Sequence, residues 1–207
     1  MRLLSSFALL VCLAIASLAA QSPAGWKVRA DRSTSATEPD AAGTIKFTAA
    51  GKGFHAVNPQ AAVYWNPANT AKGTYTLKGT FTLNEPSGHT NYYGLVFGGS
   101  DLDGAKQAYT YFLVAQDGTF LVKKRIGDDK TDDVVAKTPN AAIKKPDASG
   151  KSTNMLEVRV AADKVDYVVN GTVVGSSPKT GLATDGVWGI RVNHLLNVNV
   201  EDIGVGK

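Results

Sequence analysis

The sequence predicts an all-β protein built from two packed antiparallel sheets, and three observations support that prediction. Short segments in which apolar and polar residues alternate follow one another along most of the chain. Turn-forming residues separate these segments at close intervals. No long segment has the 3.6-residue period of an amphipathic helix. About a dozen short strands at this spacing are typical of a two-sheet β-sandwich.

The first half of the chain is expected to contribute five strands. They are Trp26–Ala30, Thr44–Thr48, Phe54–Val57, Ala61–Trp65 and Thr74–Leu83. The last of these alternates most clearly, and its apolar face holds Tyr75, Leu77, Gly79, Phe81 and Leu83. This pattern indicates a half-buried antiparallel strand. The polar segment Asp31–Gly43 is expected to be a loop, and Trp65-Asn66-Pro67 a turn that ends the fourth strand.

The second half of the chain is expected to contribute eight strands. They are Asn91–Gly98, Ala108–Ala115, Thr119–Ile126, Asn154–Ala162, Lys164–Asn170, Thr172–Gly175, Gly186–Asn193 and Asn197–Ile203. Asn170-Gly171 predicts a tight hairpin, because both residues tolerate the positive φ of a type I′ turn. The segment Ala136–Lys151 lacks a strand pattern and is expected to be a long loop. Asp128-Asp129 and Asp132-Asp133 are expected at a solvated hairpin tip.

The first residues resemble a secretory signal peptide. Arg2 precedes an uncharged apolar run from Leu3 to Ala20, and the small residues Ser17 and Ala19 suit a signal peptidase. We therefore expect cleavage after Ala19, a single domain over residues 20–207, and a secreted or periplasmic protein with no membrane span after cleavage. An uncleaved membrane anchor is the alternative, because the run is near the lower limit for crossing a bilayer. Cleavage would remove Cys12, the only cysteine.

The charge of the chain does not point to nucleic acid. The formal net charge is +4, and removal of Met1–Ala19 would take away Arg2 and no acid, which leaves +3. Acidic and basic residues are interspersed, and the basic clusters Lys123-Lys124-Arg125 and Lys144-Lys145 lie in no nucleic-acid motif. These clusters are expected on a solvated strand face or loop, and DNA or RNA is not an expected partner.

Several blocks of sequence resemble a known kind of domain. The blocks are Tyr93–Phe97, Tyr109–Val114, Asp117–Phe120, Asn154–Val158, Val168–Val174 and Gly186–Ile190. Their order is similar to that of concanavalin A-like jelly rolls, in particular the bacterial laminin-G-like group that includes 3-keto-disaccharide hydrolase domains. The resemblance covers the chain from about Trp26 to the end and implies a jelly-roll sandwich. In these relatives the fold carries carbohydrate binding, some glycoside cleavage and many members with no assigned role, and the resemblance does not choose between them.

A catalytic pair of carboxylates is not evident. Glycoside cleavage normally needs two of them on either side of the scissile bond. The four glutamates are far apart in the chain, at Glu38, Glu85, Glu157 and Glu201. Acids two residues apart occur only at Glu38/Asp40 and Asp101/Asp103. The sequence therefore favours a binding protein over an enzyme, and a glycoside or keto-sugar hydrolase with acids from separate loops remains the alternative.

A metal site is possible at one loop. Asp101 and Asp103 lie between two expected strands, and oxygen-rich loops suit Ca²⁺, although Asp103-Gly104 is also an ordinary turn pair. His55, His89 and His194 show no ligand spacing, so zinc is not expected.

The candidate ligand-binding residues are aromatic and polar groups on or beside the central strands. They are Trp65, Tyr92, Tyr111, Arg125, Arg191 and His194. Trp65 is expected to be the better exposed tryptophan, and Trp188 is expected in the core. The strands 91–98 and 108–115 are apolar on both faces, which favours a central position with a covered or concave outer face. We expect an exported protein that binds an oligo- or polysaccharide. An envelope module that binds proteins is a further alternative, and it would need a flat apolar patch.

Overall fold

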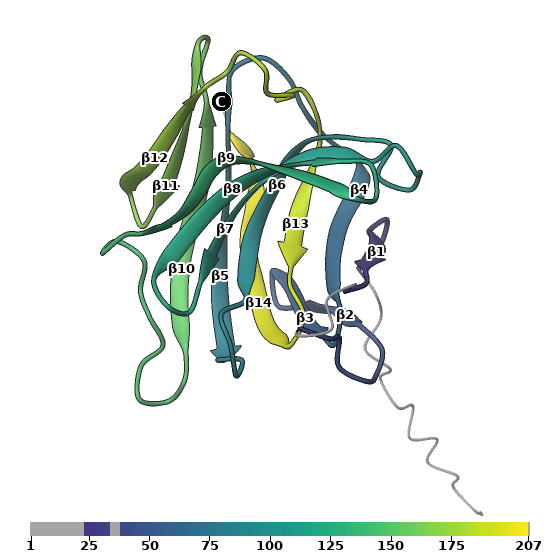
Figure 1. Cartoon of the computed structure of the whole chain (residues 1–207), viewed down its shortest axis with the longest axis vertical. Coiled ribbons are helices and arrows are strands. Elements are labelled where there is room, and N and C mark those ends of the chain that lie inside the picture. Colours follow the sequence, from purple (N-terminus) through teal and green to yellow (C-terminus); the bar gives the residue numbers. More distant parts are fainter. Residues whose placement is uncertain (1–22, 34–37, 207) are drawn as a thin grey trace, which may run out of the picture.

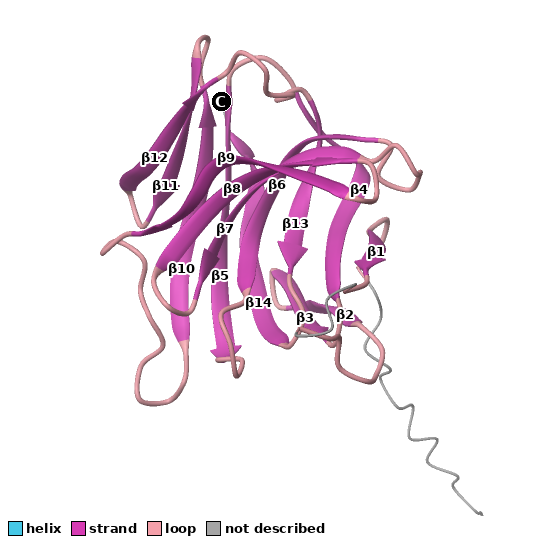
Figure 2. Cartoon of the chain, in the orientation of Figure 1, coloured by secondary structure: helices cyan, strands magenta, loops and turns pink. Residues whose placement is uncertain are grey.

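The structure is a computed structural model that describes residues 23–33 and 38–206 of the 207-residue chain. The predicted signal peptide, Met1–Ala19, lies outside the described residues. Every regular secondary-structure element among the described residues is a β-strand. The strands form two packed antiparallel sheets of seven strands each (Figures 1 and 2). A search of the described residues finds no helix with the length and apolar character needed to cross a membrane.

The first sheet, called sheet A, contains both of the strands that are apolar on two faces. Its strand order is β1 (Lys27–Asp31), β4 (Ala61–Ala71), β13 (Gly186–Val192), β6 (Tyr92–Ser100), β7 (Ala108–Ala115), β8 (Thr119–Ile126) and β9 (Lys130–Pro139). The central position of β6 and β7 confirms the prediction made from their apolar faces.

The second sheet, called sheet B, lies behind sheet A in Figure 1. Its strand order is β12 (Thr172–Pro178), β11 (Lys164–Val169), β10 (Ser152–Val160), β5 (Tyr75–Glu85), β14 (Leu196–Gly206), β3 (Gly53–Asn58) and β2 (Lys46–Ala50). Each of the thirteen predicted strands corresponds to one of the described strands, within a few residues at the ends, apart from the C-terminal extension of β4.

The main core lies between the two sheets and follows the predicted alternation. Leu77, Phe81 and Leu83 of β5 are fully buried, as are the inward residues of β10 and β11. The hairpin between β11 and β12 also matches its prediction, because Asn170 and Gly171 have φ values of 50° and 83°. Trp188 joins this core, as predicted.

A second hydrophobic cluster covers the outer face of sheet A. It contains Val63, Trp65, Val96, Leu102, Tyr109, Tyr111, Leu113 and Leu121. Trp65 is only 3% exposed and Tyr111 6%, so the expectation that Trp65 is exposed is wrong. The apolar character of both faces of β6 and β7 correctly predicted a covered or concave outer face, but it could not show that Trp65 belongs to the covered cluster.

Sheet A curves so strongly that side chains of its edge strand β1 reach those of β8 across this outer face. Strands β1 and β8 are five positions apart in the sheet, which would separate them by about 24 Å if the sheet were flat. Nevertheless Asp31 Oδ1 on β1 lies 2.8 Å from Arg125 Nη2 on β8. The outer face is therefore concave, and β8 contributes Leu121 to the second cluster.

Strand β4 runs past the predicted turn at Asn66-Pro67. The pairing of β1 with β4 ends at Trp65, so beyond it β4 pairs with β13 alone among the described strands. Proline lacks an amide hydrogen, and its cost is small where one side of a strand is unpaired. On the partner strand β13, the pairing register shifts between Val187 and Gly189, which accommodates the proline in β4.

Strand β9 was missed because its sequence is strongly charged. Asp132 and Asp133, predicted at a hairpin tip, lie within the strand, and only Asp128 and Asp129 belong to the turn. Charged residues are common on edge strands, where they discourage pairing with other chains. Lys123 of β8 pairs with Asp133 at 3.1 Å and helps to hold this edge. The loop predicted from Ala136 therefore begins only after Pro139.

Candidate functional site

A groove made of two adjoining hollows lies at the edge of the concave face. The hollows have volumes of about 420 and 590 Å³, and Asn193 and His194, which follow β13, line both of them. We call the smaller one the arginine hollow, after Arg125 and Arg191, and the larger one the histidine hollow, after His89 and His194. Both open beside the second hydrophobic cluster.

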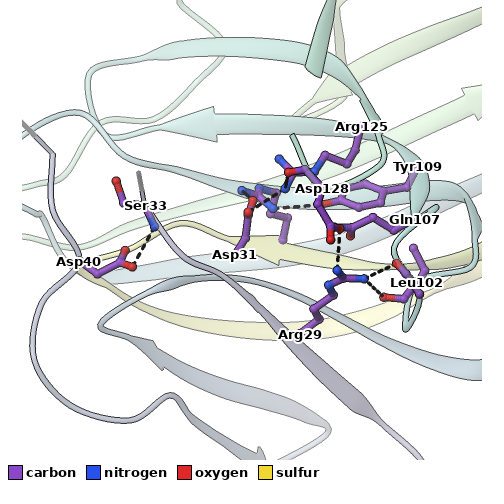
Figure 3. A network of polar contacts seen from close by, with 11 residues as sticks. Arg29, Asp31, Ser33, Asp40, Leu102, Gln107, Tyr109, Arg125 and Asp128 are labelled. Atoms are coloured by element: carbon purple, nitrogen blue, oxygen red, sulfur yellow. Dashed lines mark hydrogen bonds and ion pairs between the residues drawn. The ribbon is translucent and has the colours of Figure 1, made fainter. Parts of the chain in front are cut away.

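The arginine hollow is built around one carboxylate. Asp31 accepts hydrogen bonds from Arg125 Nη2 at 2.8 Å and from Arg191 Nη2 at 2.6 Å (Figure 3). Burial alone would raise the pKa of Asp31. The attraction and hydrogen bonds of Arg191 and Arg125 outweigh burial and hold the pKa below its ordinary value. Arg191 also donates to the Tyr109 hydroxyl at 2.9 Å and stacks 5.4 Å from the centre of the Tyr111 ring.

A second ion pair fastens the turn between β8 and β9 to β1. Arg29 Nη2 donates to Asp128 Oδ1 at 2.6 Å, and Arg29 Nη1 donates to the carbonyl of Gly104 at 2.6 Å. Gln107 donates to the same Asp128 oxygen at 2.9 Å, so three elements meet at this carboxylate (Figure 3). These contacts hold the curvature that creates the groove.

The histidine hollow brings together groups that are distant in the sequence. His89 comes from the loop between β5 and β6, and its Nε2 lies 2.9 Å from His194 Nε2. Asn91 Nδ2 is 3.2 Å from the same His89 nitrogen, and Asp40 Oδ1 is 3.7 Å from His194 Nδ1. Burial and the neighbouring His89 lower the pKa of His194, and the carboxylates of Asp40 and Glu38 oppose this only in part.

Tyr92 provides the aromatic side chain of the histidine hollow. It is partly exposed, and its hydroxyl lies 3.0 Å from Thr119 Oγ1. Lys137 beside it forms an ion pair with Asp117 at 2.9 Å. The hollow thus presents one aromatic ring among polar groups that are largely engaged with one another.

The six predicted binding residues all lie on or beside the outer face of sheet A. Four of them line the groove, and two are buried beneath it. Tyr92, Arg125, Arg191 and His194 line the groove. Trp65 and Tyr111 lie beneath it in the second hydrophobic cluster. Sequence reasoning missed the contributions of His89 and Asn91. No local signal could have found them, because 105 positions separate His89 from its partner His194.

The charges that line the groove are balanced. Among the described residues, the arginine hollow has as many basic groups as acidic ones: Arg32, Arg125 and Arg191 against Asp31, Asp128 and Asp129. The histidine hollow shows the same balance, with Lys123 and Lys137 against Glu38 and Asp133. The groove therefore has no formal excess charge apart from its histidines.

Two polar atoms at the groove lack protein partners. Asn193 Oδ1 and Arg125 Nε are buried without a hydrogen bond to any described residue. An unmade hydrogen bond at a buried atom costs about 1–3 kcal/mol.

The two acids of the predicted calcium loop contact protein groups. Asp103 forms an ion pair with Lys27, and Asp101 Oδ2 accepts from the amide of Lys106 at 3.1 Å. Within residues 23–33 and 38–206, no group of three histidine, cysteine or acidic residues is arranged to hold a metal. A Ca²⁺ site at Asp101 and Asp103 stays a prediction.

Comparison with known proteins shows the fold and no family. No family model matches the sequence, and no curated protein matches it. The carbohydrate binding module CBM66 from Bacillus subtilis is 11% identical with a TM-score of 0.62, over 88% of this chain and 96% of that one. A Bacillus subtilis protein of unknown function with a galectin-like fold is 11% identical with a TM-score of 0.53, over 87% and 88% of the two chains. The chain thus has a concanavalin A-like, galectin-like β-sandwich fold.

Proposed function

We propose that this protein binds neutral oligo- or polysaccharides in the groove and does not cleave them. The observation that carries the proposal is the charge-balanced polar lining of the groove beside the partly exposed Tyr92. A sugar hydroxyl can both donate and accept, so a neutral sugar suits a lining that offers donors and acceptors without excess charge. A uronate or sulfated sugar would add a charge that the balanced lining does not neutralise.

The shape and composition of the groove suit a sugar ring. Tyr92 offers a partly exposed aromatic face, against which the apolar face of a pyranose can stack. The amides of Asn91 and Asn193 and the ring of His194 lie beside it and can orient hydroxyl groups. The fold supports this reading as an analogy, since the solved module with the same architecture is a carbohydrate-binding one.

Three acids of the groove, Asp31, Asp128 and Asp133, are poor candidates for glycoside hydrolysis. A general acid for this reaction needs a carboxyl group whose pKa is raised. The pKa of Asp31 is instead lowered, because two arginines hold it ionised. Asp128 pairs with Arg29 and Asp133 with Lys123, so these carboxylates are also committed to cations. Binding therefore accounts for the groove better than catalysis.

A protein-binding envelope module is the less supported alternative. The large hydrophobic side chains that are exposed among the described residues are Val28, Ile126, Val173, Leu195 and Val205. They lie on four strands and one turn of the two sheets and form no flat apolar patch that a protein partner would need.

Export and the domain boundaries belong to the same proposal. The signal-peptide pattern of Met1–Ala19 would direct the chain out of the cytoplasm, as a secreted or periplasmic single domain over residues 20–207. Polysaccharides are abundant ligands outside the cell, so an exported location is consistent with a polysaccharide ligand. The mass of the protein recovered from the exported fraction tests the cleavage.

A glycan array followed by calorimetry tests the binding proposal. We expect neutral glycans to bind more tightly than about 1 mM and acidic ones more weakly. Asn193→Ala and Tyr92→Ala should each weaken binding about 5- to 10-fold, the effect of losing about 1 kcal/mol. Asn84→Ala is the matched control, because Asn84 lies on sheet B and donates to Asn197. A folded protein that binds no neutral glycan at millimolar concentration would refute the proposal.

A further inference from the structure

Two histidine nitrogens face each other at the centre of the histidine hollow. His89 Nε2 and His194 Nε2 are 2.9 Å apart, and their rings are tilted by 57° with centroids 5.1 Å apart. His89 is partly exposed, while His194 is largely buried. Their ring nitrogens can share at most one proton along this line, or both can direct their lone pairs at a single cation.

The carboxylate behind His194 favours the second arrangement. Asp40 Oδ2 accepts the amide hydrogen of Ser33 at 2.9 Å, so one oxygen of the carboxylate is held in place. The other oxygen, Asp40 Oδ1, faces His194 Nδ1 at 3.7 Å and is buried with no hydrogen-bond partner among the described residues. The distance of 3.7 Å is that of an ion pair and is too long for a hydrogen bond. A proton on Nδ1 of His194, on the side of this carboxylate, would leave the Nε2 lone pair free toward His89. A carboxylate commonly lies behind a histidine that binds a metal.

We propose that His89 and His194 form a two-histidine site for a divalent transition metal, with Cu²⁺ or Ni²⁺ preferred over Zn²⁺. The nitrogen separation is the basis of the preference. Two nitrogens at about 2.0–2.1 Å from a tetrahedral Zn²⁺ would be about 3.3 Å apart, whereas a right angle at the metal brings them to about 2.9 Å. Cu²⁺ and Ni²⁺ favour such tetragonal geometry and bind nitrogen ligands tightly.

The surroundings of the pair leave the remaining metal positions open. The amide of Asn91 lies 3.2 Å from His89 Nε2, and a half-turn of that amide would present its oxygen in place of its nitrogen. Glu38 lines the same hollow and adds a negative charge nearby. With no third histidine, cysteine or acid arranged as a ligand among the described residues, water completes the shell. The site is therefore exchangeable, and weaker than a four-ligand structural site.

Titration of the full chain, purified without a histidine tag, with CuCl₂ and with NiCl₂ tests the site. We expect one ion per chain, with Zn²⁺ bound more weakly than Cu²⁺. His89→Ala and His194→Ala should each lower the affinity at least about 10-fold, and Asp40→Asn about 10- to 100-fold. His55→Ala is the matched control, because His55 lies on sheet B and contacts Asn197 at 2.8 Å.

An electron paramagnetic resonance spectrum of the Cu²⁺-loaded wild type provides a second readout that needs no variant. Splitting from two nitrogen ligands is expected, and a spectrum with oxygen ligands alone would overturn the proposal. Binding that persists unchanged in the His89→Ala/His194→Ala double variant would overturn it as well. No glycan is present in these measurements, so the result is independent of the function proposed above.

Discussion

The outer faces of the two sheets differ in polarity. On sheet B, many outward side chains are polar, as in the Thr82–Thr153 contact at 2.9 Å and the chain of Asn84, Asn197 and His55. On sheet A, where β6 and β7 are apolar on both faces, outward side chains form a buried hydrophobic cluster. The difference shows that a strongly curved sheet with apolar outward residues can acquire a second core, and that a binding groove can open where this core meets solvent.

The largest expected effect is the removal of the central side chain of that second core. We expect Trp65→Ala to lower the free energy of unfolding by about 3–5 kcal/mol, because it leaves a cavity where a large ring is 3% exposed. Val173→Ala on sheet B should change it by no more than about 0.5 kcal/mol, since Val173 is 49% exposed. Urea unfolding measures both. A cost below about 1 kcal/mol for Trp65→Ala would show that the face is not a core.

A smaller loss is expected from breaking the ion pairs that close the face. Asp31→Ala leaves Arg125 and Arg191 without their shared carboxylate, and we expect a cost of about 3 kcal/mol. The control on sheet B is Glu157→Ala. Its partner Arg159 is 44% exposed, so the loss there should be at most about 1 kcal/mol. Equal losses at the two sites, measured by urea unfolding, would contradict the assigned difference between the faces.

The smallest expected effect is a pH dependence that comes from the same carboxylate. The pKa of Asp31 is lower in the folded protein than its ordinary value of 3.8. Its ionised carboxylate therefore contributes fully to the free energy of unfolding at pH values above 3.8. The contribution declines as the pH falls below 3.8 toward the lowered pKa of the folded state. Asp31→Asn should therefore flatten the acid side of a plot of unfolding free energy against pH. An unchanged slope below about pH 4 would show that Asp31 is not held ionised.

Local patterns predicted most of the strands but little of the site. Period-two alternation identified β5 and β10, and Asn-Gly located a hairpin, because these signals need only near neighbours. The strongly charged β9 was missed because its stability comes from pairing with β8 and not from its own residues. Arg191 and His194 could be selected as polar groups beside strands, but their partners Asp31 and His89 lie 160 and 105 positions away.

The sequence by itself determined the all-β class, the positions of most strands along the chain and which side of these strands faces the main core. Each of these depends on residues a few positions apart. Only the tertiary structure decided that Trp65 is buried, that Asp31 joins two arginines and that two histidines meet in one hollow. Those results depend on how strongly sheet A curves. Curvature arises from the twist and pairing of seven strands together, and no single segment of the chain specifies it.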